Sequence, residues 1–220
     1  MELFIYGFIG ITVVGWVLFA VLVLLRRQIR MNRGGEWQRV ANEMGFSYHE
    51  RGSSLPPQFP DFDMFTHGAG RLGDMLEGEV DGVWFCIMDY KPRERPTRTI
   101  CLLRSDTLTF PYFFLQPANI LTHAFSKLFS GIGYPMVELA EDPEFKAGYL
   151  LQGKDVAAVK AFFTPSVRGF FTSRRHRNYC VQADGQALYF LHRNRRFRPD
   201  QAHDILKEAF EFRALFMGNR

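Results

Sequence analysis

The most distinctive hydrophobic pattern is an unbroken run from Leu3 to Leu25, which contains 23 residues and no charged side chain. An α-helix rises about 1.5 Å per residue, so a run of this length can cross a hydrocarbon core of about 30 Å. A helix packed on a soluble domain would need a polar face, and this run has none. We therefore expect residues 1–25 to form a transmembrane anchor in contact with the lipid bilayer through residues 3–25.

A cleaved signal peptide is the alternative to a retained span. Signal peptides begin with a positive segment, continue with about 7–15 apolar residues and end in small residues. Here Glu2 is the only charged side chain before the run, the run is longer, and no A-x-A site follows it. These features favour a retained helix.

The flank of the run predicts its orientation. Residues 26–33 read "RRQIRMNR", with four arginines and no acid, so residues 26–35 form a basic juxtamembrane segment. Positive residues beside a span stay on the cytoplasmic side. The sequence therefore predicts a single-pass protein of the bacterial inner membrane, with the N-terminus outside and residues 36–220 in the cytoplasm.

Residues 36–220 alternate between strand-like and helix-like patterns, and the strands are mostly joined as hairpins. This order predicts one α+β domain with a mostly antiparallel sheet and several helices. The expected strands are 46–50, 75–80 and 83–90 around a turn at Asp81-Gly82, 99–105, 111–117, 144–153, and a hairpin over 178–192 that turns at Asp184-Gly185. The expected helices are 36–44 ended by Gly45, 119–129, 155–163, one that opens at Thr164-Pro165, and 200–217.

The cysteines and histidines predict no cofactor and no metal site. Cys86, Cys101 and Cys180 are odd in number and widely spaced, which fits a reducing compartment and neither a disulfide framework nor zinc. No two of the six histidines are spaced i and i+4 on one helix. His176 and His192 come close through the hairpin, where membership of a basic surface is favoured over a metal or acid–base pair.

One stretch matches a dinucleotide-binding fingerprint in its letters. "GAGRLG" supplies Gly68, Gly70 and Gly73, and Asp89 follows at the end of an apolar strand. Such a site needs a strand before the glycines and a full helix after them. The residues that follow alternate as a strand does, so a glycine-rich turn that leads into a hairpin is the better interpretation.

Two arginine clusters bracket the hairpin over 178–192. With a turn at Asp184-Gly185, paired residue numbers sum to about 369, which sets Arg177 opposite His192 and Arg175 opposite Asn194. The clusters would then meet at the open end of the hairpin, and the one acid between Arg168 and Arg198 is Asp184, which lies at the far end by the turn. The candidate residues for binding an anionic partner are Arg174, Arg175, Arg177, Arg193, Arg195, Arg196 and Arg198.

Three interpretations compete for this basic end. A solvated edge also protects the hairpin from pairing with other strands. Anionic lipid headgroups or an acidic protein would suit arginine, whose planar group binds two oxygens at once. Nucleic acid or a phosphorylated partner is less favoured, because Tyr179 and Phe197 are the only nearby aromatic candidates for stacking and the excess of 27 basic over 23 acidic residues is modest.

The first hundred residues also resemble a bacterial family of small membrane-anchored proteins of uncharacterised function. The resemblance rests on "GFSY", on the spaced Phe59, Phe62 and Phe65 with Gly68, on Gly78 and Gly82, and on Asp89-Tyr90. It implies a membrane anchor but no reaction or cofactor.

The function expected from the sequence is a binding or scaffolding module at the cytoplasmic membrane face that uses the arginine-rich hairpin end. The alternative is a membrane-tethered hydrolase or transferase of unrecognised type. Neither G-x-S-x-G nor a P-loop is present, and acids such as Asp61, Asp63 and Asp89 could form a catalytic pair only through folding.

Overall fold

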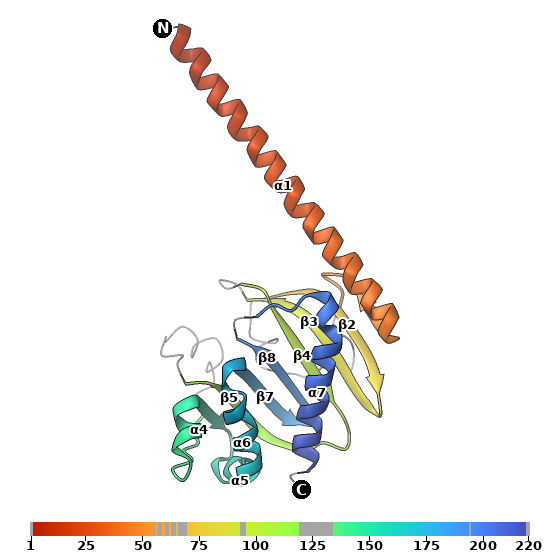
Figure 1. The fold of residues 1–220 in the computed structure, drawn as a ribbon, viewed down its shortest axis with the longest axis vertical. Helices are drawn as coiled ribbons and strands as arrows, with labels where there is room; N and C mark the ends of the chain where they lie inside the picture. The colour runs from red at the N-terminus through yellow and green to blue at the C-terminus, as the bar shows by residue number, and fades with distance from the viewer. Residues whose placement is uncertain are drawn as a thin grey trace.

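The computed structural model describes residues 2–54, 56, 59, 62, 65, 70–92, 96–118, 134–193 and 195–218, and the side chains of residues 2–15, 26, 27 and 29–31 lie outside the description. The chain forms one long helix and an α+β domain (Figure 1). Its elements are α1 (Glu2–Met44), β1 (Ser47–His49), β2 (Arg71–Val80), β3 (Val83–Lys91), β4 (Arg98–Arg104), β5 (Phe110–Pro117), α4 (Pro143–Gly148), β6 (Tyr149–Gly153), α5 (Val156–Phe162), α6 (Pro165–Ser173), the 3₁₀ turn η1 (Arg175–Arg177), β7 (Tyr179–Gly185), β8 (Ala187–His192), η2 (Pro199–Gln201) and α7 (Ala202–Met217).

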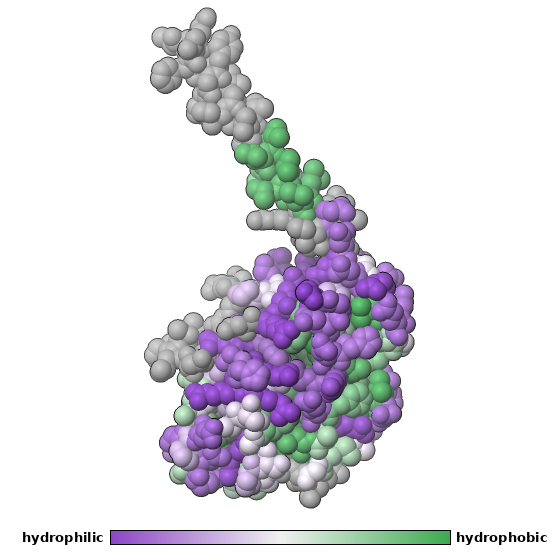
Figure 2. Space-filling view, viewed as in Figure 1, coloured by the Kyte–Doolittle hydropathy of each residue, from purple (hydrophilic) through white to green (hydrophobic). Residues whose placement is uncertain are grey.

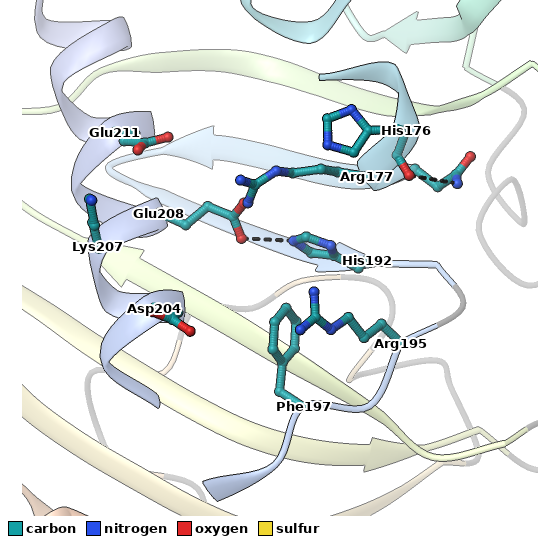
Figure 3. Close-up of a pocket in the computed structure, with 10 residues that line it drawn as sticks. His176, Arg177, His192, Arg195, Phe197, Asp204, Lys207, Glu208 and Glu211 are labelled. Atoms are coloured by element: carbon teal, nitrogen blue, oxygen red, sulfur yellow. Dashed lines mark hydrogen bonds and ion pairs between the residues drawn. The ribbon is translucent and has the colours of Figure 1, made fainter. Parts of the chain in front are cut away.

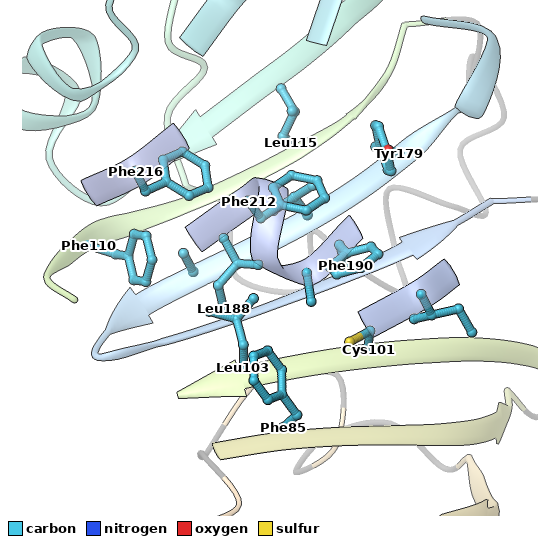
Figure 4. Packing of buried hydrophobic residues seen from close by; sticks show 14 of the residues in the cluster. Phe85, Cys101, Leu103, Phe110, Leu115, Tyr179, Leu188, Phe190, Phe212 and Phe216 are labelled. Carbon is cyan, nitrogen blue, oxygen red and sulfur yellow. The ribbon is translucent and has the colours of Figure 1, made fainter. Parts of the chain in front are cut away.

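The domain is built on one eight-stranded sheet in the order β1-β2-β3-β4-β8-β7-β5-β6, and each neighbouring pair is antiparallel. This confirms the predicted α+β class with an antiparallel sheet. The end of α1 and helices α5, α6 and α7 contribute to the core on one face, where Phe212 and Phe216 of α7 pack with Phe190 and Leu188 (Figure 4). A smaller cluster on the other face includes Phe62, which lies 5.0 Å from the Tyr189 ring.

Strand alternation decides which side chains meet the helices. Successive residues of a strand point to opposite faces. In β3, Phe85 and Ile87 belong to the helix-covered core, whereas Cys86 and Met88 belong to the other cluster. The same period of two places Asp89 on the helix-covered side, and in the hairpin it places Tyr179 and His192 there as well.

Helix α1 is longer than the sequence predicted. A separate helix was expected over 36–44, but the structure has one continuous helix from Glu2 to Met44. The Gly34-Gly35 pair lies within the helix and does not interrupt it. Gly34 faces the hydroxyl of Tyr48. Gly45 ends it at a φ of 70°, which confirms the predicted glycine stop. Trp37, Val40 and Ala41 bury the base of α1 in the domain core.

The part of α1 from Trp16 to Leu25 is apolar and exposed. Large side chains between Trp16 and Leu25 stand clear of the domain (Figure 2). Over the part of the chain with described side chains, no helix has a stretch long and apolar enough to cross a membrane. Residues 3–15 of the predicted span lie outside that part.

The β2–β3 hairpin explains two glycines of "GAGRLG", Gly70 and Gly73. Its turn has positive φ at both Asp81 and Gly82, as a tight two-residue hairpin requires. Gly73 lies inside β2, where an added Cβ would fall 2.7 Å from the Cβ of Asp89, and at Gly70 it would fall 2.2 Å from the Tyr90 ring. Strand β2 occupies the place where a dinucleotide site would need a helix, so the role of Gly70 and Gly73 is close packing. Gly68 lies outside the described residues.

Replacing Gly73 with alanine is expected to lower the free energy of unfolding by about 1–3 kcal/mol, because overpacked sites cost that much. The new methyl would meet Asp89 on its Cβ and on its backbone oxygen at 3.1 Å, and backbone cannot move aside as a side-chain tip can. Urea denaturation of the purified protein measures the effect. Gly35→Ala is the matched control, since nothing lies within 4 Å of a Cβ there and alanine favours a helix. Equal stability of the two variants would contradict the packing role.

Two other regions differ from the expected elements. Residues 144–153 were predicted as one strand, but they divide into α4 and the edge strand β6. Asp142 caps α4 by accepting a hydrogen bond from the backbone nitrogen of Phe145 at 3.0 Å, and Pro143 occupies its first turn, so the local signals for a helix outweigh the apolar pattern. The predicted helix over 119–129 lies outside the described residues.

The C-terminal predictions agree closely with the structure. Asp155 caps α5 by accepting from the nitrogen of Ala158 at 3.0 Å. Thr164 is the N-cap residue of α6, and Pro165 is its first residue. The last helix, expected over 200–217, is η2 followed by α7.

Candidate functional site

The open end of the β7–β8 hairpin differs in detail from the predicted register. Tyr179 pairs with His192, and Asp184 pairs with Ala187, so the turn is Gly185-Gln186. Gly185 has a φ of 55° and therefore suits the first turn position, one residue later than predicted. The expected pairing of Arg177 with His192 is wrong, because Arg177 lies in η1 beyond the ladder.

The two basic segments nevertheless become neighbours. Asn178 adopts the left-handed conformation at a φ of 52°, which turns the chain from η1 into β7. The backbone nitrogen of Arg193 donates to the backbone oxygen of Asn178 at 3.0 Å. The segments 174–177 and 193–198 therefore lie side by side, as expected. The predicted partner of Arg175, Asn194, lies outside the described residues.

Asp89 forms the first charged cluster at this end of the domain. Its carboxylate is fully buried and receives the guanidinium of Arg33 through Nε at 3.0 Å and Nη2 at 3.1 Å. Arg196 donates to the same carboxylate through Nη2 at 2.6 Å, and Thr99 donates its hydroxyl at 3.0 Å. Arg33 also donates to the backbone oxygen of Phe197 at 2.7 Å. The cluster thus joins α1, β3, β4 and the segment after β8.

Glu208 of α7 forms the second cluster, and it too is buried. His192 shares a hydrogen bond of 2.7 Å with one carboxylate oxygen, and both Arg177 and the hydroxyl of Tyr179 donate to the other. Burial opposes ionisation, but the bonds and charges from His192, Tyr179 and Arg177 outweigh it and lower the pKa of Glu208. Burial and the adjacent carboxylate raise the pKa of Tyr179. Glu208 is therefore a satisfied buried anion.

The other arginines of the predicted patch also have neighbours. Arg174 pairs with Glu211 at 3.4 Å and lies over the Phe170 ring. Arg175 donates to the backbone oxygen of Ala147 at 2.8 Å, and Arg198 pairs with Asp200 at 2.9 Å.

The predicted picture of seven arginines far from acids therefore needs correction. The acids come from β3, η2 and α7, and at least four of the seven guanidinium groups are in ion pairs, those of Arg174, Arg177, Arg196 and Arg198. Asp200 of η2 is only two residues from Arg198, whereas the acids of β3 and α7 are distant in sequence from their arginines. The guanidinium of Arg195 lies 4.3 Å from the centroid of the Phe197 ring. Among the described residues Arg195 makes no side-chain hydrogen bond or ion pair.

A pocket of about 600 Å³ opens between the hairpin end and α7. His176, Arg177, His192 and Arg195 line one wall, and Asp204, Lys207, Glu208 and Glu211 of α7 line the other, with Phe197 between them (Figure 3). Glu208 and His192, which share a hydrogen bond, are buried at its base. Figure 3 shows the Arg195 guanidinium directed toward Phe197 and His192.

The histidines and cysteines fit their expected roles in part. His176 is exposed, as a member of a basic surface should be, but His192 is buried against Glu208, so its assignment to the surface was wrong. All three cysteines are free and buried, and burial raises the pKa of Cys180 to about 12. Within the described part of the chain, no three His, Cys, Asp or Glu side chains are placed to hold a metal ion.

Asp89, Arg33 and Glu208 are site residues that the sequence interpretation did not assign. Glu208 had a detectable signal, because it lies between Ile205 and Phe212 on the stripe by which α7 contacts the core. A charged residue on such a stripe is almost never buried without a partner. Asp89 had a similar signal, since it follows a strand that is otherwise nearly all apolar.

Comparison with known proteins identifies a structure with a similar fold but does not assign the chain to a family. No family model matches the chain, and no curated protein matches its sequence significantly. Among solved structures, the chain is similar to the crystal structure of the mycobacterial trehalose monomycolate transport factor A, TtfA, with a TM-score of 0.58 and 11% identity. The match covers 86% of this chain and 95% of that one. At this identity the likeness shows the shared fold alone.

Proposed function

We propose that this chain is a single-pass protein of the bacterial inner membrane whose cytoplasmic α+β domain is a binding module at the membrane face. Residues 3–25 form the span, with the N-terminus outside. The observation that carries this proposal is the continuity of α1, which joins an exposed apolar segment ending at Leu25 to the Trp37, Val40 and Ala41 side chains in the domain core.

The side of the domain from which α1 leaves supports a role at the membrane surface. The segment 193–198 lies against the base of α1, because Arg33 donates to the Phe197 oxygen and shares Asp89 with Arg196 (Figure 1). From Leu25 to Arg33 a helix rises about 12 Å. That distance is slightly more than one Debye length, which is about 10 Å at 0.1 M salt, so salt weakens the attraction between these arginines and the headgroups without abolishing it.

Anionic lipid headgroups or an acidic protein are the partners that this surface suits. Each basic residue near an anionic leaflet contributes about 1 kcal/mol, so several together contribute usefully even though each is weak. The exposed side chains of Arg195 and Arg198 supply such charges. Nucleic acid is not favoured, since the nearby rings of Tyr179 and Phe197 are buried and cannot stack on bases.

Alkaline extraction of membranes tests the anchor. The full chain is expected to remain in the pellet, whereas a chain shortened to residues 28–220 is expected to be released. The shortened chain begins before Arg33 and so keeps its bonds to Asp89. It should still bind vesicles that contain phosphatidylglycerol, bind them less in high salt, and ignore phosphatidylcholine vesicles. Extraction of the full chain with the soluble proteins would rule out the span.

The pocket gives some support to the alternative function, a membrane-tethered hydrolase or transferase, because two histidines and three acids line it. However, Nε2 of His192 and both oxygens of Glu208 are already bound to each other or to Arg177 and Tyr179. Among its described lining residues there is also no serine, threonine or cysteine to act as a nucleophile. A binding role therefore accounts better for the geometry.

A further inference from the structure

We infer that the pocket between the hairpin end and α7 binds a phosphate group, with Arg195 as its principal contact. This inference rests on the proposed binding role and names the chemistry of the ligand. The phosphate belongs either to a lipid headgroup or to a soluble phosphate compound, and both present a tetrahedral phosphate with negatively charged non-bridging oxygens. The cavity of about 600 Å³ lies within the range of small-molecule sites, about 300–1,000 Å³.

Two acids of the pocket lining, Glu208 and Glu211, are already paired with arginines and so contribute little to the attraction of a charged ligand. Glu208 is neutralised by Arg177 and bonded at both oxygens, and Glu211 is paired with Arg174. The base of the pocket is thus closed to a further cation. A ligand meets the remaining charged groups at the rim.

The rim carries an excess of positive charge. Arg195 and Lys207 are exposed, and within the described residues neither makes an ion pair. Asp204 is the one acid of the lining that likewise has no ion pair there. His176, also exposed, adds a ring that can donate a hydrogen bond. Two permanent cations against one anion favour a negatively charged ligand.

Arg195 is positioned in advance for this contact. Its guanidinium lies over the Phe197 ring at 4.3 Å, and stacking leaves the N–H groups at the edge of the guanidinium free to bind oxygen. The backbone of Phe197 is held in place by two hydrogen bonds. Its nitrogen donates to the hydroxyl of Thr99 at 3.0 Å, and its oxygen accepts from Arg33. Little side-chain freedom is therefore lost when a ligand binds.

Phosphate fits this rim better than a carboxylate does. Arg195 and His176 stand on the hairpin wall and Lys207 stands on α7 (Figure 3). A carboxylate directs its two oxygens to one side and would be satisfied by Arg195 alone. A tetrahedral phosphate directs oxygens to both walls, and arginine binds two of them at once.

The full chain in micelles of a non-ionic detergent provides the test, with inorganic phosphate and glycerol 3-phosphate as probes in calorimetric titration. A parallel experiment places the chain in phosphatidylcholine nanodiscs with and without phosphatidylglycerol. Arg195→Gln is expected to weaken binding at least about tenfold, since it removes a charged hydrogen-bonding group. Arg39→Gln removes the same charge from an exposed residue of α1 that is paired with Glu43 and does not line the pocket, so binding should change less than about twofold.

Binding of the soluble probes with this dependence on Arg195 identifies a soluble phosphate ligand. The same dependence seen only with phosphatidylglycerol identifies a headgroup. Absence of binding to every probe, or equal weakening by Arg195→Gln and Arg39→Gln, would overturn the inference, because diffuse charge predicts equal effects. Arg195→Lys, which keeps the charge but not the two-oxygen contact, should weaken binding partially and guards against a folding defect in the glutamine variant. These variants should not change the retention of the chain in membranes. A negative result for phosphate binding would therefore not contradict the proposed membrane anchor.

Discussion

Asp89→Asn is expected to lower the free energy of unfolding by about 3–5 kcal/mol, the usual result of removing one partner from a buried ion pair. The asparagine keeps the shape of the side chain but leaves Arg33 and Arg196 facing a neutral group. The loss is largest at Arg33, because its side chain is only 15% exposed and its charge cannot be fully hydrated in place of the lost ion pair. Urea denaturation measures the loss, and hydrogen exchange over residues 33–44 should increase as the base of α1 separates from the domain.

Asp200→Asn is the matched control for Asp89. Asp200 also accepts a two-fold contact from an arginine, Arg198, but both side chains are exposed to water. Exposed pairs contribute little, so this variant should unfold nearly as the unchanged protein does. If Asp89→Asn is no less stable than Asp200→Asn, the Asp89 cluster does not fasten α1 to the domain.

Glu208→Gln is expected to lower the free energy of unfolding by about 2–4 kcal/mol near neutral pH, because hydrogen bonds to charged groups and buried pairs are costly to lose. The amide keeps the volume of the side chain but removes the charge that faces Arg177 and gives His192 and Tyr179 a weaker acceptor. Glu211→Gln on the same helix is the control, since its pair with Arg174 is half-exposed and should change stability by less than about 1 kcal/mol.

The pH dependence of the same variant follows from the direction of the Glu208 shift. The folded protein lowers the pKa of this carboxyl below its value in the unfolded chain, about 4.3. The stabilisation is therefore complete above about pH 4.3 and is lost as pH falls through the lower folded pKa. The stability gap between the unchanged protein and Glu208→Gln should narrow below about pH 4.3 in urea denaturation. A gap that stays constant down to pH 3 would contradict the assignment.

Local signals in the sequence predicted most elements of this fold correctly. Gly45, Asp81-Gly82 and Asp155 each act through their own backbone and nearest neighbours, so their effect can be recognised without knowing the tertiary structure. The β7–β8 register was missed by one residue, because "ADGQ" allows a turn at either Asp184-Gly185 or Gly185-Gln186. Packing of alternate residues against α7 distinguishes these two registers, and that packing is not local.

The candidate site was predictable in its position but not in its charges. The arginines do gather beside the hairpin end. Asp200 lies only two residues from Arg198, but the other acids lie far away along the chain, with Asp89 separated from Arg196 by 107 residues and Glu208 separated from Arg177 by 31. Counting acids near the arginines in sequence therefore overstated the free positive charge. A charged residue on an otherwise apolar strand or helix face was the better indicator.

The unbroken course of α1 has a geometric consequence. A helix advances about 1.5 Å and turns about 100° with each residue, so one residue inserted between Leu25 and Gly34 would rotate the domain by that angle relative to the apolar end. Seven inserted residues complete about two turns and restore the heading of the domain about 10 Å further out. The number of residues in this stretch therefore determines both the distance of the domain from the apolar end of α1 and the rotation of the domain about the helix axis. That rotation determines which face of the domain a neighbour at a given position can meet.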